Sequence, residues 1–146
     1  MRTNQYPMRV IVKSKAEFEE LRRVTDYNQY PNFLFISILD PDNEVDILDS
    51  RPNHLTQRFY DLEYDVGANK AMSEEQAKEL YDFIIANESK DICFVHCSAG
   101  VSRSGAIGEF INDLYGEPYQ NFKRRNPRIS PNIHIKTLLN NLHNKE

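Results

Sequence analysis

ICFVHCSAGVSRSGAIGEF, residues 92–110, is the part of the sequence from which the fold is most readily predicted. Its first four residues are apolar and predict a short buried strand. A loop containing Gly100 follows, and apolar residues spaced three and four apart from Ala106 to Leu114 predict a helix after it. The stretch is therefore interpreted as a strand–loop–helix unit of an α/β domain.

Strands and helices are predicted to alternate along the rest of the chain. Further helices should begin at two capping boxes, starting at Ser14 and Ser73, and at Pro131-Asn132. This alternation predicts an α/β fold: a central, mostly parallel sheet of about four to five strands, flanked by helices on both faces. Gly116 should end the helix after the loop in a left-handed conformation, and residues 61–71 should form an acidic loop. The other predicted strands are Met8–Val12, Phe33–Ile38, Val45–Leu48 and Leu55–Tyr60.

Length and composition are those of a soluble globular protein. The 146 residues fit a single domain, 1–146, with 40% hydrophobic and 27% charged residues. The net charge of -4 gives no general attraction to nucleic acid or to an anionic membrane, so neither is expected as a partner. Two cysteines, no secretory signal and no apolar run of about 20 residues favour a reducing, cytoplasmic location, in a cell or an infected host.

The loop after the central strand has the composition of an anion cradle. Gly100 lets the backbone approach a ligand closely, and the N–H groups ahead of a helix attract negative charge. Cys97 at the base of such a cradle should be a thiolate near neutral pH. Arg103, six residues on, offers a planar fork for two phosphate oxygens. A thiolate with a bidentate anion clamp is suited to displacement at phosphorus.

The pattern His-Cys-x5-Arg-Ser, from His96 to Ser104, resembles the signature of the protein tyrosine phosphatase superfamily. Three further segments, Phe35–Asp40, Phe59–Leu62 and Arg128–Asn132, are similar to small dual-specificity-like phosphatases, including bacterial and phage members. The resemblance covers about residues 33–142. It implies a dual-specificity phosphatase-like three-layer fold and hydrolysis of phosphomonoesters through a phosphocysteine intermediate.

The resemblance also implies a role for each motif residue. Cys97 would be the nucleophile, Arg103 would bind the phosphoryl oxygens, and Ser104 would hydrogen-bond the sulfur and help it leave. His96 would fix the loop and help lower the thiol pKa. No metal or cofactor is needed. The phosphate would be cradled by the backbone N–H groups of Ser98, Ala99, Gly100, Val101, Ser102 and Arg103.

A general acid must come from outside the motif, on a loop a little over thirty residues upstream in the family. Asp61 lies 36 positions before Cys97 and Asp65 lies 32 positions before it. Spacing alone favours Asp65, whereas the local pattern around Phe59–Leu62 favours Asp61. We prefer Asp61 and keep Asp65 as the alternative. The tryptophan that often starts this loop in relatives is absent, since the chain has no Trp.

Other side chains have both a structural and a functional interpretation. Asn132 would cap the last helix, steady the active-site loop, or both. Cys93 is expected to be a packed thiol. The basic run Lys123–Arg125, with Arg128, is more typical of a solvated face than of a binding site for an acidic substrate. His54, His134 and His143 are expected to have surface or packing roles, and Tyr60, Tyr64 and Tyr119 are candidates for stacking on a phosphotyrosine ring.

The preferred function is therefore a protein tyrosine or dual-specificity phosphatase, whose partner is a phosphorylated protein or peptide. Relatives with the same loop act on inositol phosphates, phosphoinositides or RNA 5′ ends, and these remain alternatives. The variable loop positions lack the lysine common in phosphoinositide-directed relatives, which favours protein substrates. A phosphate-binding module without turnover and a rhodanese-like or arsenate-reductase-like thiol enzyme are further alternatives.

Overall fold

Parallel strands form the centre of the computed structural model, which describes residues 7–24, 32–42 and 53–145. The strands are β1 (Arg9–Ser14), β2 (Phe33–Leu39), β3 (His54–Arg58) and β4 (Ile92–Cys97), and their order in the sheet is β1-β4-β2-β3. Every pair is parallel, as predicted. β4 thus runs between β1 and β2 and brings the motif to the middle of the carboxyl edge, where α/β sheets bind ligands. The strand predicted over Val45–Leu48 lies outside the described residues.

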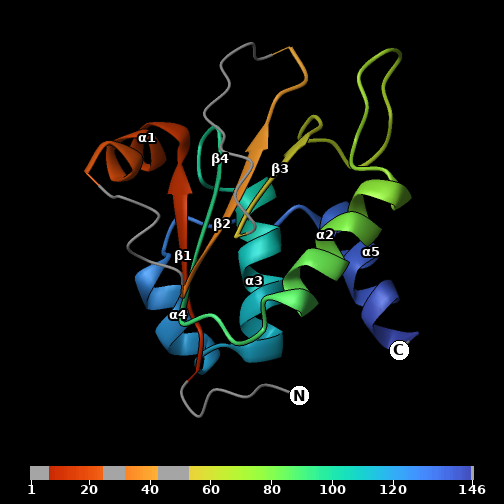
Figure 1. Ribbon diagram of the computed structural model, residues 1–146. Helices are drawn as coiled ribbons and strands as arrows, with labels where there is room; N and C mark the ends of the chain where they lie inside the picture. Colours follow the sequence, from red (N-terminus) through yellow and green to blue (C-terminus); the bar gives the residue numbers. More distant parts are fainter. Residues whose placement is uncertain (1–6, 25–31, 43–52, 146) are drawn as a thin grey trace.

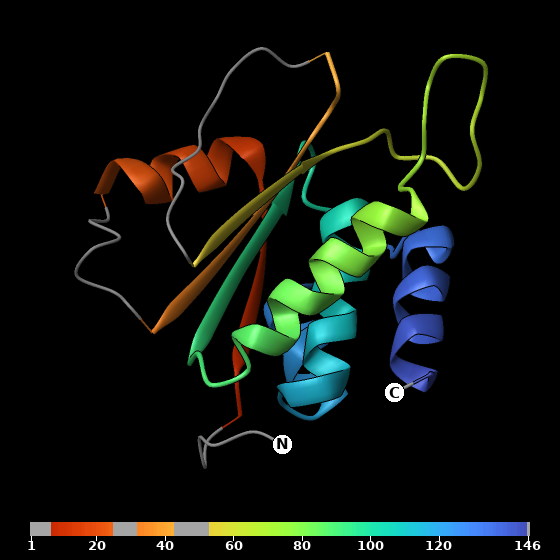
Figure 2. The same ribbon diagram turned by 45° about the vertical axis from the view of Figure 1, so that its right-hand side comes forward.

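Helices cover both faces of this sheet, which confirms the three-layer prediction (Figures 1 and 2). α1 (Lys15–Val24) packs on one face, where its Phe18 meets Phe35 and Phe94. The larger core on the other face buries alternate strand residues such as Leu34 and Ile36, because successive side chains of a strand point to opposite faces. The helices on that side are α2 (Glu74–Ala86), α3 (Arg103–Tyr115), α4 (Tyr119–Arg125) and α5 (Ile133–Asn144). Within the described ranges, no helix is both long and apolar enough to cross a bilayer.

Two predicted helix starts are confirmed by their caps. The Ser14 hydroxyl accepts a hydrogen bond from the Glu17 N–H, and the Glu17 carboxylate accepts one from the Ser14 N–H. Ser73 and Gln76 form the same reciprocal pair at the start of α2. Each pair satisfies N–H groups that a helix start leaves without an intrahelical partner.

The predicted end of α3 is wrong in its mechanism. Gly116 has φ −93 and ψ −159, an extended rather than a left-handed conformation. The Asn112 side chain instead bonds both the N–H and the C=O of Glu117 and closes the helix end. Gly116 is needed because a Cβ there would lie 1.8 Å from Asn112 Oδ1. α4, which follows at once, was not predicted.

Candidate active site

The loop between β4 and α3 rests on the junction between β1 and α1. Gly100 has φ +72, and a Cβ at this position would lie 2.6 Å from Lys13 C and from Ser14 N. Only glycine allows this backbone conformation and this close approach. The Lys15 N–H donates to Ser98 O at 3.2 Å and ties the same loop to α1.

The far side of the loop is held by the segment before α5. The Ser130 N–H donates to Val101 O at 2.9 Å, and the Asn132 N–H donates to Ser102 O at 3.1 Å. The loop carbonyls are thus engaged by neighbouring segments. The N–H groups of Gly100, Val101 and Ser104 donate toward the Cys97 sulfur, as the N–H groups of an anion-binding nest would.

Cys97 lies at the base of this nest and is almost fully buried. Its Sγ is 3.0 Å from Ser104 Oγ and 3.4 Å from the Ser104 N. Burial alone would raise the pKa of the Cys97 thiol, but hydrogen bonds from Ser104 and from the N–H groups of Val101 and Gly100 outweigh it, so the pKa is lowered. Cys93 is the opposite case, because burial without such donors raises its pKa. Of the two thiols, only Cys97 therefore has a lowered pKa.

His96 is fully buried beneath α1, and its ring stacks on Phe18 at a centroid distance of 4.1 Å. Burial lowers the pKa of His96 to about 3, so the ring is neutral at pH 7. Neither ring nitrogen has a hydrogen-bond partner among the described residues. A neutral ring cannot help lower the thiol pKa through a positive charge, and the role of His96 in fixing the loop stays a prediction.

Three hydrogen bonds from neighbouring segments hold the Arg103 guanidinium in place. Its Nη1 donates to Asp40 Oδ1 at 2.7 Å and to Phe59 O at 2.8 Å, and its Nη2 donates to Ser98 Oγ at 3.2 Å. The side chain is buried, yet its Nε has no partner in the part of the chain that the structure describes. A buried N–H without an acceptor is unfavourable, and a phosphoryl oxygen would satisfy it. Sequence reasoning missed Asp40, although an acidic residue directly after a buried strand is a signal for this edge of the sheet.

The two candidate acids lie in different surroundings. Asp61 Oδ1 accepts hydrogen bonds from Ser102 Oγ at 2.8 Å and from Asn132 Nδ2 at 2.9 Å, so this carboxylate touches the motif loop. Asp65 Oδ1 accepts from the Ala71 N–H at 3.0 Å, and its Oδ2 lies 3.6 Å from Lys70 Nζ. The contacts of Asp65 thus stay within its own loop. Asp61 is the candidate that the structure brings to the motif, and its role as the acid stays a prediction.

Asn132 caps the last helix as expected, while its side chain bonds the loop that carries Asp61 and its backbone N–H reaches the motif loop at Ser102 O. Its Oδ1 accepts from the Ile135 N–H at 3.0 Å and caps α5, while its Nδ2 donates to Asp61 and to Leu62 O at 3.1 Å. One side chain therefore fixes both a helix start and the loop that carries Asp61.

The remaining candidates have structural contacts. The Lys123 ammonium donates to the carbonyls of Pro127 and Ile129, whereas Arg125 pairs with Glu117 and Arg128 pairs with Glu17, so two of these four cations have an acidic partner. Tyr64 and Tyr119 are exposed. In the described ranges, no cluster of three or more His, Cys, Asp or Glu side chains could hold a metal ion. The histidines have the packing contacts predicted for them: His54 with Ser37, His134 with Met72 O, and His143 with Tyr81.

Comparison with known proteins identifies the fold. No protein-family model and no curated protein matches this sequence. Among solved structures, PTPMT1 in complex with PI(5)P is similar with a TM-score of 0.53 at 13% identity, over 94% of this chain and 91% of that one. The human tyrosine phosphatase-like serine/threonine/tyrosine-interacting protein is similar with a TM-score of 0.52 at 17% identity, over 90% and 85%. The chain has the protein tyrosine phosphatase superfamily fold.

Proposed function

We propose that this chain, with the fold of the protein tyrosine phosphatase superfamily, hydrolyses phosphomonoesters through a phosphocysteine intermediate. The observation that carries the proposal is the hydrogen-bonded sulfur of Cys97 in the same loop as the buried, oriented guanidinium of Arg103. A nucleophile with a lowered pKa beside a fixed cation is suited to attack on a phosphate dianion.

In the first step the Cys97 thiolate attacks phosphorus. The S–P bond forms as the ester P–O bond breaks, and the departing oxygen takes a proton from Asp61. Loop N–H groups and Arg103 neutralise the charge on the three equatorial oxygens. Asp61 is suited to this task because Oδ1 holds both hydrogen bonds from the protein, and Oδ2 has no partner among the described residues.

In the second step a water molecule attacks phosphorus and releases inorganic phosphate. Asp61, now a carboxylate, takes a proton from the water, and the S–P bond breaks with its electron pair returning to Cys97. The Ser104 hydroxyl supports this departure because it can donate a hydrogen bond to the forming thiolate across 3.0 Å.

We infer that the substrate is a phosphorylated protein or peptide, with phosphotyrosine and dual-specificity activity as the leading reading. The loop's variable positions carry no lysine to hold a second phosphate of an inositol ring. The complex of the similar PTPMT1 with PI(5)P makes a phosphoinositide the second candidate.

The test is a turnover assay with p-nitrophenyl phosphate, phosphotyrosine and phosphoserine peptides and PI(5)P vesicles, each with and without EDTA. We expect hydrolysis of the aryl phosphate and phosphotyrosine peptide that is insensitive to EDTA and abolished in Cys97→Ser. Turnover that survives Cys97→Ser would refute the mechanism. Binding of phosphate without any turnover would identify a phosphate-binding module instead.

A matched pair of variants tests the acid. Asp61→Asn should lower kcat on peptide substrates strongly, about 100-fold or more, whereas Asp65→Asn should leave it nearly unchanged. The reverse result would assign the acid to Asp65.

A further inference from the structure

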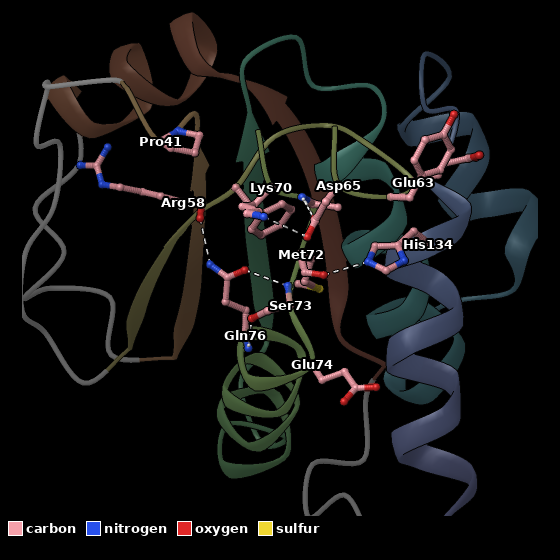
Figure 3. A pocket seen from close by; sticks show the side chains of 13 residues that line it. Pro41, Arg58, Glu63, Asp65, Lys70, Met72, Ser73, Glu74, Gln76 and His134 are labelled. Atoms are coloured by element: carbon pink, nitrogen blue, oxygen red, sulfur yellow. Dashed lines mark hydrogen bonds and ion pairs between the residues drawn. The ribbon is translucent and has the colours of Figure 1, made fainter. Parts of the chain in front are cut away.

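A second pocket, of about 640 Å³, lies beside the candidate active site (Figure 3). It lies between the end of β3, the 61–71 loop and the starts of α2 and α5, and no residue of the motif loop lines it. Its volume is within the range of ligand pockets. The lining residues used below are Pro41, Phe59, Glu63, Met72, Glu74 and His134.

One wall of this pocket is shared with the phosphate site. Pro41 follows Asp40, and Phe59 supplies the carbonyl that accepts from Arg103 Nη1. Glu63 lies two positions after Asp61. An extended peptide advances about 3.3 Å per residue, so a side chain two or three positions from a phosphorylated residue is displaced by about 7–10 Å. A peptide crossing the Asp61 rim would thus present a neighbouring side chain to this pocket.

The floor of the pocket is apolar and firmly built. Phe59 and Met72 are almost fully buried beneath it. The Met72 carbonyl already accepts from His134 Nε2 at 2.8 Å, and Gln76 Nε2 donates to Arg58 O at 2.8 Å (Figure 3). With these polar groups already paired, the floor is suited to a hydrocarbon stem.

The charge at the mouth is acidic on the side nearest α5. Lys70 is paired with Asp65, whereas Glu63 and Glu74 have no ion pair among the described residues. Figure 3 shows Glu63 and His134 beside α5 and Glu74 apart from Glu63, near the start of α2, with Arg58 on the side away from α5. Two carboxylates without cations over an apolar floor favour a side chain with a hydrocarbon stem and a positive end, and disfavour an anionic headgroup.

We propose that this pocket binds a lysine or arginine side chain of the protein substrate, close in sequence to its phosphorylated residue. The stem lies in the pocket above the buried Phe59 and Met72, and the cation reaches one of the two carboxylates at the mouth, Glu63 or Glu74. The inference rests on the proposed function, because it requires the phosphorylated residue to occupy the Cys97 loop.

The test compares phosphotyrosine peptides that differ at single positions from −3 to +3, each carrying lysine, norleucine or glutamate. We expect lysine at one or two positions to raise kcat/KM about three- to tenfold over norleucine, with glutamate lowest, and the advantage to shrink at high salt. The double variant Glu63→Gln with Glu74→Gln should lose the lysine advantage. Glu75→Gln, the exposed neighbour on α2 outside the pocket, should keep it.

Hydrolysis of p-nitrophenyl phosphate separates the two hypotheses, since this substrate is too small to reach the pocket. If wild type does not hydrolyse it, the proposed function fails, and the inference fails with it. Normal hydrolysis with equal kcat/KM for lysine and norleucine peptides overturns the inference alone. Faster turnover of PI(5)P vesicles than of every peptide also overturns it.

Discussion

Ser104→Ala tests the electrostatics of Cys97, the proposed nucleophile. The hydroxyl is buried with Cys97, and its Oγ lies 3.0 Å from Sγ. A hydrogen bond to an ionised group contributes about 1.5–3 kcal/mol, so its loss should lower the thiolate-to-thiol ratio at a given pH about ten- to hundredfold. The N–H donors of Gly100, Val101 and Ser104 remain in the variant and hold the loop.

The assay is the pH dependence of alkylation by iodoacetamide, with the modified cysteine identified by mass spectrometry. The midpoint for Cys97 should move to higher pH in Ser104→Ala, because losing the donor raises the pKa of the thiol. Cys93 should stay unmodified in the folded protein, since it is buried and its pKa is raised. Ser37→Ala, which removes an equally buried hydroxyl that bonds His54, is the matched control. An unchanged midpoint in Ser104→Ala would show that the hydroxyl does not stabilise the thiolate.

Three further predictions concern stability and coupling. Gly100→Ala should lower the free energy of unfolding in urea by more than about 2 kcal/mol, through a positive φ and overlap with the Lys13–Ser14 backbone. Gly67→Ala, also at positive φ but with nothing within 4 Å, should lose only about 1 kcal/mol, and equal losses would contradict the packing argument. Asn132→Ala and Ser73→Ala should each lower the free energy of unfolding by about 1 kcal/mol, because each removes a helix cap. Only Asn132→Ala should also lower kcat, because only the Asn132 side chain bonds Asp61. The pKa of His96 is lowered to about 3 in the folded state. As the pH is lowered from about 6.5 to 3, the free energy of unfolding should fall, because the unfolded chain binds a proton that the folded chain does not. His96→Gln should flatten that fall, and equal pH slopes would show that His96 does not cause it.

Much of the fold and of the motif could be predicted because the signals are local. The capping boxes at Ser14 and Ser73 each fall within four residues, and the apolar run of β2 needs only its own composition. The loop from His96 to Ser104 is likewise contiguous, with its strand before it and its helix after it.

The missed features depend on residues brought together from distant parts of the chain. Asp40 orients Arg103 across 63 positions of sequence, and Asn132 meets Asp61 across 71. The predicted end of α3 is wrong because glycine allows both extended and left-handed backbone. The hydrogen bonds of Asn112, one turn earlier, select the extended conformation at Gly116. Spacing could not separate Asp61 from Asp65, because it does not show which carboxylate turns back to its own loop.

The contact between Gly100 and the Lys13–Ser14 backbone determines where the shortest fragment with an intact Cys97 loop can begin. The family resemblance begins only at about Phe33, and every residue assigned to chemistry lies after it. Yet the loop that shapes the nucleophile is seated on the junction of β1 and α1, and the Lys15 N–H pins Ser98 from the same place. A fragment beginning at Phe33 would keep the whole signature but would lack the Lys13–Lys15 backbone that the signature loop packs against. The first strand and helix are therefore part of the proposed catalytic unit, although they carry none of its proposed reacting groups.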